Sequence, residues 1–165
     1  FAVRKAIAST VEVSRSRWKY VADVELQLDP HLPEVSCLVA EINQVVLNLI
    51  VNASDAIASR HGQHGERKGR IRIATARCGE QAEIRVTDNG TGIPIRTRNR
   101  LFEPFFTTKE VGKGTGQGLS ICRNIIVRKH GGELTFESTE GEGSVFIVRL
   151  PMQRVRSDEA GKEAQ

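Results

Sequence analysis

The chain has 165 residues, of which 39% are hydrophobic and 27% charged, and 24 lysines and arginines against 20 aspartates and glutamates give a net charge of +4. This length suffices for one hydrophobic core, and the composition excludes a disordered chain. The longest apolar run, residues 45–57, is interrupted by Asn48, Asn52, Ser54 and Asp55, so no transmembrane segment is expected. The three cysteines are far apart and form no CxxC pair, which predicts neither a disulfide framework nor a zinc site.

The positive charge is concentrated in three segments. Residues 1–20 carry five basic side chains and one acidic one, residues 60–70 carry four and one, and residues 93–113 carry five and two. Binding of nucleic acid would require such basic side chains to be interleaved with aromatic ones that stack on bases, but only 5% of the residues are aromatic. We therefore expect no nucleic-acid partner.

The first half of the chain predicts helix, strand and helix. Residues 2–13 have helical spacing of apolar side chains, and residues 20–28 alternate between apolar and polar side chains as in a strand. The strongest helix pattern runs over residues 38–59, where apolar side chains recur every three or four positions. Residues 60–69 contain three glycines and predict a flexible connection.

The second half predicts two strand hairpins and two helices. In chain order these are a hairpin of residues 70–77 and 82–87, a short helix ending near residue 101, a helix over residues 119–129 and a hairpin of residues 133–138 and 144–150. Residues 102–118, between the two helices, have little apolar periodicity and predict a long loop. Because hairpin strands pair antiparallel, we expect an α+β fold, a two-layer α/β sandwich with a mixed, largely antiparallel sheet and helices on one face.

Two asparagines on the long helix form the first candidate site. Asn48 and Asn52 are four residues apart, so they lie on the same face of the helix, at the edge of its apolar stripe. Both are poor helix formers, and solvated amides would explain either one alone. Amide oxygens are suitable ligands for Mg²⁺, which keeps most of its water and binds chiefly to phosphates.

The second candidate is the segment Asp88-Asn89-Gly90-Thr91-Gly92 at the end of a predicted strand. A carboxylate at this place can accept a hydrogen bond from an exocyclic amine. The glycines allow the backbone to come close to a flat ring. Taken alone, the segment is more typical of an ordinary turn.

The predicted long loop contains the remaining two candidates. Residues 102–109 include three of the six phenylalanines and end at Lys109, which favours either a small satellite core or a loop that packs in one state and lifts in another. Residues 112–119 have glycine at every second position and run into a helix, where free backbone amides can bind phosphate. The spacing matches neither a P-loop nor a dinucleotide-binding fingerprint.

In this order and spacing, the four segments resemble the N, G1, F and G2 boxes of the ATP-binding catalytic domain of sensor histidine kinases, within the GHKL ATPase superfamily. The resemblance covers residues 18–151. It implies a Bergerat-type ATP-binding fold that binds ATP and Mg²⁺. It also implies a protein histidine kinase, which transfers the γ-phosphate to a histidine on a separate dimerisation domain, for onward transfer to a response regulator.

The resemblance also implies roles for individual residues. Asp88 would bind the adenine amino group, and Asn52 would bind Mg²⁺. Asn48 and Lys109 would be catalytic: Asn48 would orient the phosphates, and Lys109, or alternatively Lys113, would neutralise the γ-phosphate. The nucleotide-binding set it implies is Asn48, Asn52, Asp55, Asp88, Gly90, Gly92, Ile93, Phe106, Thr107, Lys109, Gly114, Thr115, Gly116, Gln117, Gly118, Leu119 and Ser144. Two members depart from the family pattern: Asp55 stands where many relatives have lysine, and Gln117 stands where leucine is usual.

None of the four histidines suits the role of phosphoacceptor. They are His31, His61, His64 and His130. The first follows a proline in a turn, the next two lie in a glycine-rich loop, and His130 ends a helix, where a cation is favoured. The acceptor is therefore expected N-terminal to Phe1.

The expected organisation follows from this. Residues 1–17 would end a connection from the missing dimerisation and phosphoacceptor domain, residues 18–151 would form the catalytic domain, and residues 152–165 a flexible tail. The expected partners are that missing domain and the receiver domain of a response regulator, within a homodimeric full-length protein. We expect a cytoplasmic domain without membrane contact, which is compatible with a membrane-anchored parent protein.

Three alternatives share the ATP site. Chaperones, type II topoisomerases and mismatch-repair proteins of the same superfamily hydrolyse ATP with a glutamate four residues before the metal-binding asparagine. Here that residue is Asn48, which cannot act as a base. A serine kinase of the anti-sigma type would modify a hydroxyl group instead, and a degenerate module would bind ATP without turning it over.

Overall fold

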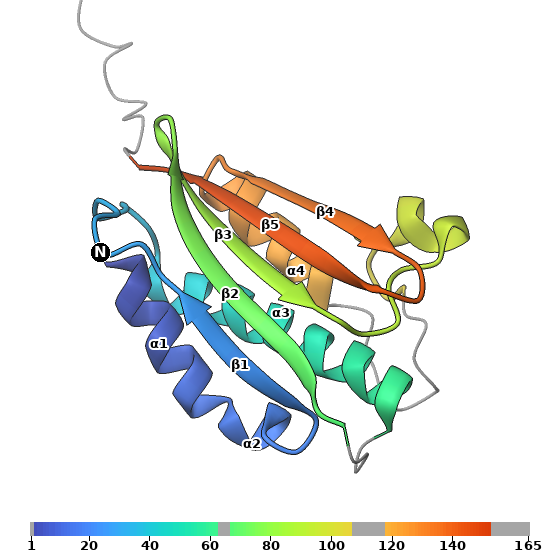
Figure 1. Cartoon of the computed structure of the whole chain (residues 1–165). Coiled ribbons are helices and arrows are strands. Elements are labelled where there is room, and N and C mark those ends of the chain that lie inside the picture. The colour runs from blue at the N-terminus through green and yellow to red at the C-terminus, as the bar shows by residue number, and fades with distance from the viewer. Residues whose placement is uncertain (1, 63–66, 107–117, 153–165) are drawn as a thin grey trace, which may run out of the picture.

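The computed structural model describes residues 2–62, 67–106 and 118–152. A five-stranded sheet forms one layer, and helices cover one of its faces (Figure 1). The strand order is β1-β2-β3-β5-β4, with β1 parallel to β2 and every other pair antiparallel. The strands are β1 (Ala22–Gln27), β2 (Gly69–Cys78), β3 (Gln81–Asp88), β4 (Glu133–Thr139) and β5 (Gly143–Pro151). The predicted α+β fold, with two layers and a mixed, largely antiparallel sheet, is confirmed.

The expected helices occur in the expected order, with small differences at their ends, and α2 (Arg15–Trp18) is an additional short helix that the sequence did not predict. They are α1 (Val3–Val13), α2 (Arg15–Trp18), α3 (Val39–His61), the 3₁₀ helix η1 (Ile95–Arg100), α4 (Gly118–Arg123) and the π-helix η2 (Asn124–Lys129). The last two form one continuous helical segment, which changes from α to π geometry at Asn124. α3 continues two residues beyond Ser59, so Arg60 lies in its last turn and not in the connection that the sequence predicts.

The core lies between the sheet and α3. Alternate residues of β2 and β3 point toward the helices and are fully buried, as are residues of α3 at helical spacing. These side chains are Ile71, Ile73, Ile84, Val86, Ile42, Leu49, Ile50 and Ile57. α1 adds Val3, Ile7 and Val11 to the same cluster. The predicted boundary after residue 17 stays a prediction, but α1 packs in this core together with α3.

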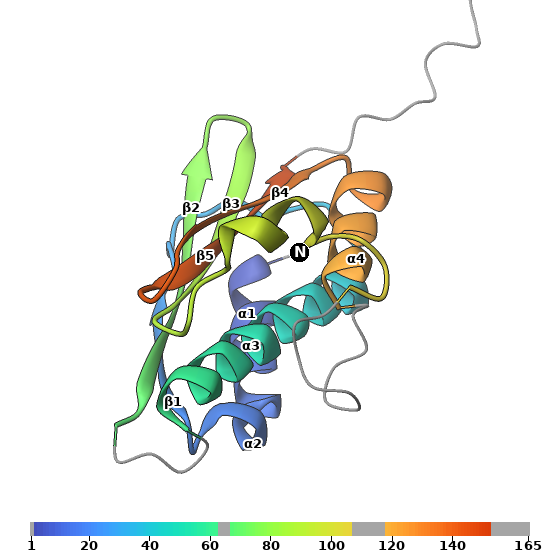
Figure 2. The same cartoon turned by 90° about the vertical axis from the view of Figure 1, so that its right-hand side faces the viewer.

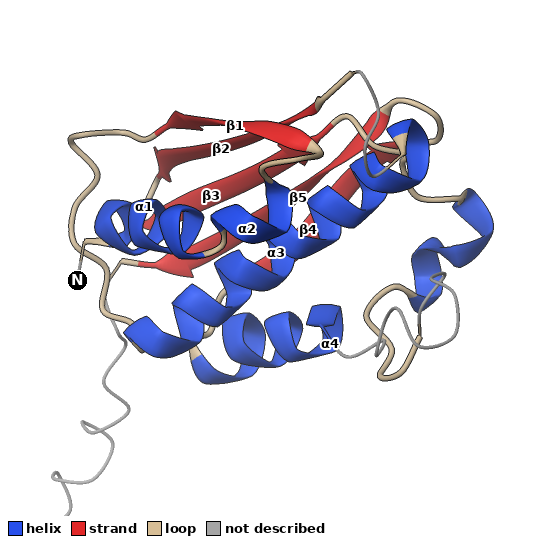
Figure 3. Ribbon diagram, turned by 90° about the horizontal axis from the view of Figure 1, so that it is seen from below, coloured by secondary structure: helices blue, strands red, loops and turns tan. Residues whose placement is uncertain are grey.

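The segment of α4 and η2 lies beside α3 on the same face of the sheet and runs antiparallel to it (Figures 2 and 3). Near the start of α3, Glu41 forms an ion pair with Lys129 at the end of η2. Three residues earlier, the Leu38 amide donates to His130 Nε2 over 3.0 Å. His130 therefore ties the end of η2 to the start of α3. No helix within the described ranges is long and apolar enough to cross a membrane.

Candidate functional site

Both predicted asparagines lie on α3, and Asn48 contacts the start of α4. Asn48 is half-buried, and its amide nitrogen lies 3.5 Å from the carbonyl oxygen of Gly118, a long contact at the first residue of α4. Asn52, one helical turn further, is also half-buried, as is Asp55. α3 thus carries three half-buried polar side chains over two turns, and the first of them, Asn48, lies at the start of α4.

Asp88 is the last residue of β3, and its side chain is buried, with 7% of its surface exposed. The Gly90 amide donates to its Oδ1 over 2.9 Å, and the Ser144 amide also hydrogen bonds to the carboxyl group. Burial nevertheless raises the pKa of Asp88 from 3.8 to about 6, because desolvation outweighs these two donors. The structure therefore offers a buried, directed carboxyl group at the C-terminal end of the central strand.

The loop after Asp88 packs tightly against α3 and the last hairpin. A Cβ at Gly90 would lie 2.6 Å from the Cβ of Ala56, and the Thr91 amide donates to the Ala56 carbonyl over 3.3 Å. Gly92 has a φ of +71°, and a Cβ there would lie 2.4 Å from the Thr139 carbonyl oxygen. Close packing within the protein therefore requires glycine at both positions. The sequence analysis had explained these glycines only by the approach of the backbone to a flat ring.

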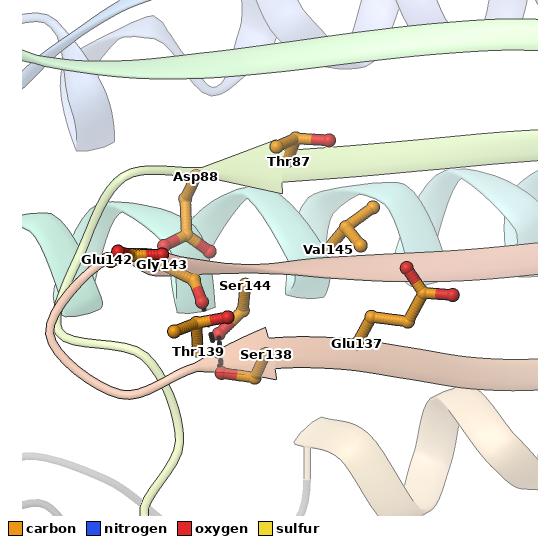
Figure 4. Close-up of a pocket in the computed structure, with 9 residues that line it drawn as sticks. All are labelled: Thr87, Asp88, Glu137, Ser138, Thr139, Glu142, Gly143, Ser144 and Val145. Atoms are coloured by element: carbon orange, nitrogen blue, oxygen red, sulfur yellow. Dashed lines mark hydrogen bonds between the residues drawn. The ribbon is translucent and has the colours of Figure 1, made fainter.

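Two serines connect this loop to the last two strands. Ser138 Oγ accepts the Ile93 amide over 2.8 Å and lies 2.8 Å from Ser144 Oγ, the latter pair drawn in Figure 4. Arg98 Nη2 donates to the Ser138 carbonyl over 2.8 Å, and its Nε donates to the Ile93 carbonyl over 3.2 Å. Ser144, which the sequence analysis assigned to the site, is thus part of a polar network. The network also includes Ser138 and Arg98, which the sequence analysis did not assign to the site.

A pocket of about 270 Å³ opens where β3 and β4 end and β5 begins (Figure 4). Its lining residues are Thr87, Asp88, Glu137, Ser138, Thr139, Glu142, Gly143, Ser144 and Val145. Neighbours along a strand point to opposite faces, so Thr87, Glu137 and Val145 point away from the helices. The pocket therefore lies partly on the uncovered face of the sheet and is not by itself the predicted adenine site, which requires the helix side of Asp88.

The predicted loop residues are only partly described. Phe106 is half-buried, and the Arg100 guanidinium lies 4.7 Å from the centre of its ring. Gly118 and Leu119 begin α4 and are half-buried. The other members lie outside the described residues, and their roles stay predictions: Thr107, Lys109, Gly114, Thr115, Gly116 and Gln117.

Sequence reasoning missed Arg60, Arg98 and Ser138. Each hydrogen bonds to a backbone group of the loop that follows Asp88. The one available signal for Arg60 was its position four residues after Ala56, on the helix face that meets this loop.

The donor groups can be compared with the needs of Mg²⁺. Within the described ranges, no three His, Cys, Asp or Glu side chains gather where they could hold a metal ion. The Asn48 and Asn52 amides fit a magnesium ion that binds chiefly to phosphate oxygens and takes one or two protein ligands.

The fold, together with the order of the four motifs in the sequence, is that of an ATP-binding domain of the Bergerat type. A family model described as "Histidine kinase-, DNA gyrase B-, and HSP90-like ATPase" matches residues 38–154. The chain belongs to this family.

The chain is similar to known sensor kinases. It is 46% identical over 114 residues to the two-component sensor PprA of Pseudomonas aeruginosa, and this match covers 68% of the chain and 12% of PprA. It is 41% identical over 130 residues to the sensor histidine kinase ZraS of Escherichia coli K12, and this match covers 79% of the chain and 26% of ZraS. The chain therefore matches only a small part of these longer proteins.

The chain is also similar to solved structures of histidine kinases. The catalytic domain of the histidine kinase ThkA has 32% sequence identity and a TM-score of 0.77, over 92% of this chain and 93% of that domain. A structure of ThkA in complex with the response regulator protein TrrA has 29% identity and a TM-score of 0.74, over 93% of this chain and 41% of ThkA.

Proposed function

We propose that the chain is the catalytic domain of a sensor histidine kinase, which binds Mg-ATP and transfers the γ-phosphate to a histidine on a separate dimerisation domain. The phosphoryl group then passes to the receiver domain of a response regulator. The similarity to PprA, ZraS and ThkA supports this reaction, and the ThkA complex with TrrA supports the partner.

The observation that carries the proposal is the environment of Asp88. Its carboxyl group is buried, is directed by two backbone amides, and lies at the end of a strand next to α3, which bears Asn48 and Asn52. A buried acceptor of this kind can read the exocyclic amine of adenine, while the phosphates extend toward the asparagines and the start of α4. Asp88 would thus select the base.

The reaction requires positioning more than a general base. Phosphoryl transfer depends on in-line geometry and on neutralisation of phosphate charge, to which Mg²⁺ contributes when bound. Asn52 would supply an amide oxygen to the ion, and Asn48 would orient the phosphates. Asn48 cannot deprotonate water, so hydrolysis by this chain alone should be slow.

The wider assembly is part of the same proposal. The full-length protein would be a homodimer in the bacterial cytoplasm or attached to the membrane through another segment. This domain itself would contact neither membrane nor nucleic acid. Lys109 would neutralise the γ-phosphate.

The experiment measures binding of ATP to this chain by calorimetry, with and without Mg²⁺, together with turnover of labelled ATP. Asn52→Ala should abolish the dependence of affinity on Mg²⁺, and Asp88→Asn should abolish the preference for ATP over GTP. Gln44→Ala, an exposed amide on the same helix, and Asp23→Asn, an exposed carboxylate, are the matched controls.

Two outcomes would contradict the proposal. Unchanged nucleotide affinity in both site variants would rule out the assigned site. Rapid hydrolysis by the isolated chain, lost in Asn48→Ala, would favour an ATPase of the chaperone class. Phosphotransfer is then tested with a histidine-bearing helical dimerisation domain as acceptor.

A further inference from the structure

We infer that Arg60 is a positioning residue that orients the Asp88 carboxylate for base recognition, an inference that rests on the proposed function. Arg60 lies in the last turn of α3, outside all four sequence motifs. Its Nη1 atom donates to three backbone carbonyl oxygens: that of Asn89 over 2.9 Å, that of Gly90 over 3.4 Å and that of Glu142 over 3.3 Å.

The first of these contacts acts on Asp88 through a single peptide group. The Asn89 carbonyl and the Gly90 amide belong to the same planar trans peptide, since no peptide bond described is cis. Arg60 binds the oxygen of this peptide, and the hydrogen at its other end is donated to Asp88 Oδ1 over 2.9 Å. The guanidinium therefore fixes the plane of the donor that directs the carboxylate.

The third contact acts on the second donor. Glu142 lies in the turn between β4 and β5, two residues before Ser144, whose amide also hydrogen bonds to the Asp88 carboxyl group. Arg60 thus binds both backbone segments from which Asp88 receives a hydrogen bond. One side chain on α3 therefore contacts both the loop after β3 and the last hairpin, which a backbone hydrogen bond from the Gly141 amide to the Thr91 carbonyl also joins.

The chemistry of Arg60 suits this role. Within the described ranges it has no carboxylate partner, so its charge is directed entirely at carbonyl oxygens. All three carbonyl oxygens surround one nitrogen, Nη1, whose two hydrogens are shared among them. Because the guanidinium is planar, these two hydrogens have fixed directions, whereas the lysine ammonium is a point charge on a flexible stem. The cation also lies at the C-terminal end of α3, where it is favourable, and Arg60→Lys keeps that effect.

The test measures affinity for ATP and for GTP in parallel. GTP carries a carbonyl where ATP carries the exocyclic amine, so a correctly oriented carboxylate favours ATP. Arg60→Ala should reduce affinity for ATP about tenfold with little change for GTP, because a charge-assisted contact that orients the donor is lost. Arg60→Lys should give an intermediate ratio.

Arg70→Ala is the matched control. Arg70 is an exposed arginine of β2 next to the same loop. The Asn89 side chain accepts a hydrogen bond from the Arg70 backbone amide, which alanine keeps. The control should leave the ratio of ATP to GTP affinity unchanged, although it removes the same charge.

The outcomes separate this inference from the proposed function. If the unsubstituted chain does not prefer ATP, the proposed function fails. If it prefers ATP and Arg60→Ala keeps the same ratio, or loses both nucleotides in parallel, Arg60 does not position Asp88. Should Arg60→Ala fail to fold, the ratio in Arg60→Lys decides: a reduced ratio supports the inference, and an unchanged one overturns it.

Discussion

The hydroxyl oxygens of Ser138 on β4 and Ser144 on β5 lie 2.8 Å apart, and the Ser138 oxygen also accepts the backbone amide of Ile93. The loop after β3 is thereby tied to the last hairpin at a point where neither serine is exposed. The loop after Asp88 is thus held against the last hairpin by two side chains, in addition to the pairing of Asp88 with Ser144 in the sheet.

Ser138→Ala should lower the free energy of unfolding by about 1–3 kcal/mol, because it leaves the Ile93 amide without its acceptor in a partly buried site. It should also weaken ATP binding, since the loop that follows Asp88 loses its anchor. Urea denaturation and calorimetry measure the two effects. Thr135→Ala, an exposed hydroxyl on the same strand, should change neither, and an equal loss in both variants would contradict the role of the serine pair.

The buried Asp88 makes stability depend on pH. Its pKa in the folded chain, about 6, lies above its ordinary value of 3.8, so the folded state binds more protons than the unfolded state between these values. The free energy of unfolding should therefore fall as pH rises from about 4 to about 6, by at most about 3 kcal/mol from this residue, and then level off. Chemical denaturation over this pH range measures the slope.

Asp88→Asn should remove this pH dependence and increase stability at pH 7, because the cost of a buried charge disappears. The same variant should lose the preference for ATP. A variant that is no more stable at pH 7, or that keeps the slope, would mean that another group titrates. Asp23→Asn, on the exposed edge strand, should leave the slope unchanged.

Gly92→Ala should be more destabilising than Gly79→Ala, although both glycines have a positive φ, of +71° and +62°. The cost of the left-handed backbone, of order 1 kcal/mol, is common to the two. A Cβ at Gly79 meets nothing within 4 Å, whereas at Gly92 it would lie 2.4 Å from the Thr139 carbonyl. The difference between the two midpoints of thermal unfolding measures this clash, and equal midpoints would contradict it.

The sequence predicted the parts of the site that local pattern encodes. The alternation in β3 and the glycines after Asp88 place a carboxyl group at a strand end, and helical spacing puts Asn48 and Asn52 on one face of α3. Both are properties of short segments, and the structure agrees with them.

The contacts around Asp88 could not be predicted in this way. Arg60 reaches carbonyls 29 and 82 residues away, and Ser138 reaches an amide 45 residues away. Any side chain with a donor or acceptor can bind a backbone group, so the residue type carries no signal. Only the tertiary fold brings these segments together. In addition, the sequence analysis ended the long helix two residues too early, so it placed Arg60 in the connection after the helix.

His130→Ala tests the contact between η2 and the start of α3. His130 Nε2 accepts the Leu38 amide over 3.0 Å, and Nδ1 lies 2.8 Å from the Ile125 carbonyl oxygen, which requires the hydrogen to be on Nδ1. Alanine removes both hydrogen bonds, so the free energy of unfolding should fall by about 1–2 kcal/mol. ATP affinity should change little, because Gly118 and Asn48 lie at the opposite end of the helical segment. His31→Ala removes an exposed histidine in a turn and is the control, which should keep full stability. An unchanged unfolding midpoint in His130→Ala would contradict the prediction, because solvent would then replace both hydrogen bonds at no cost.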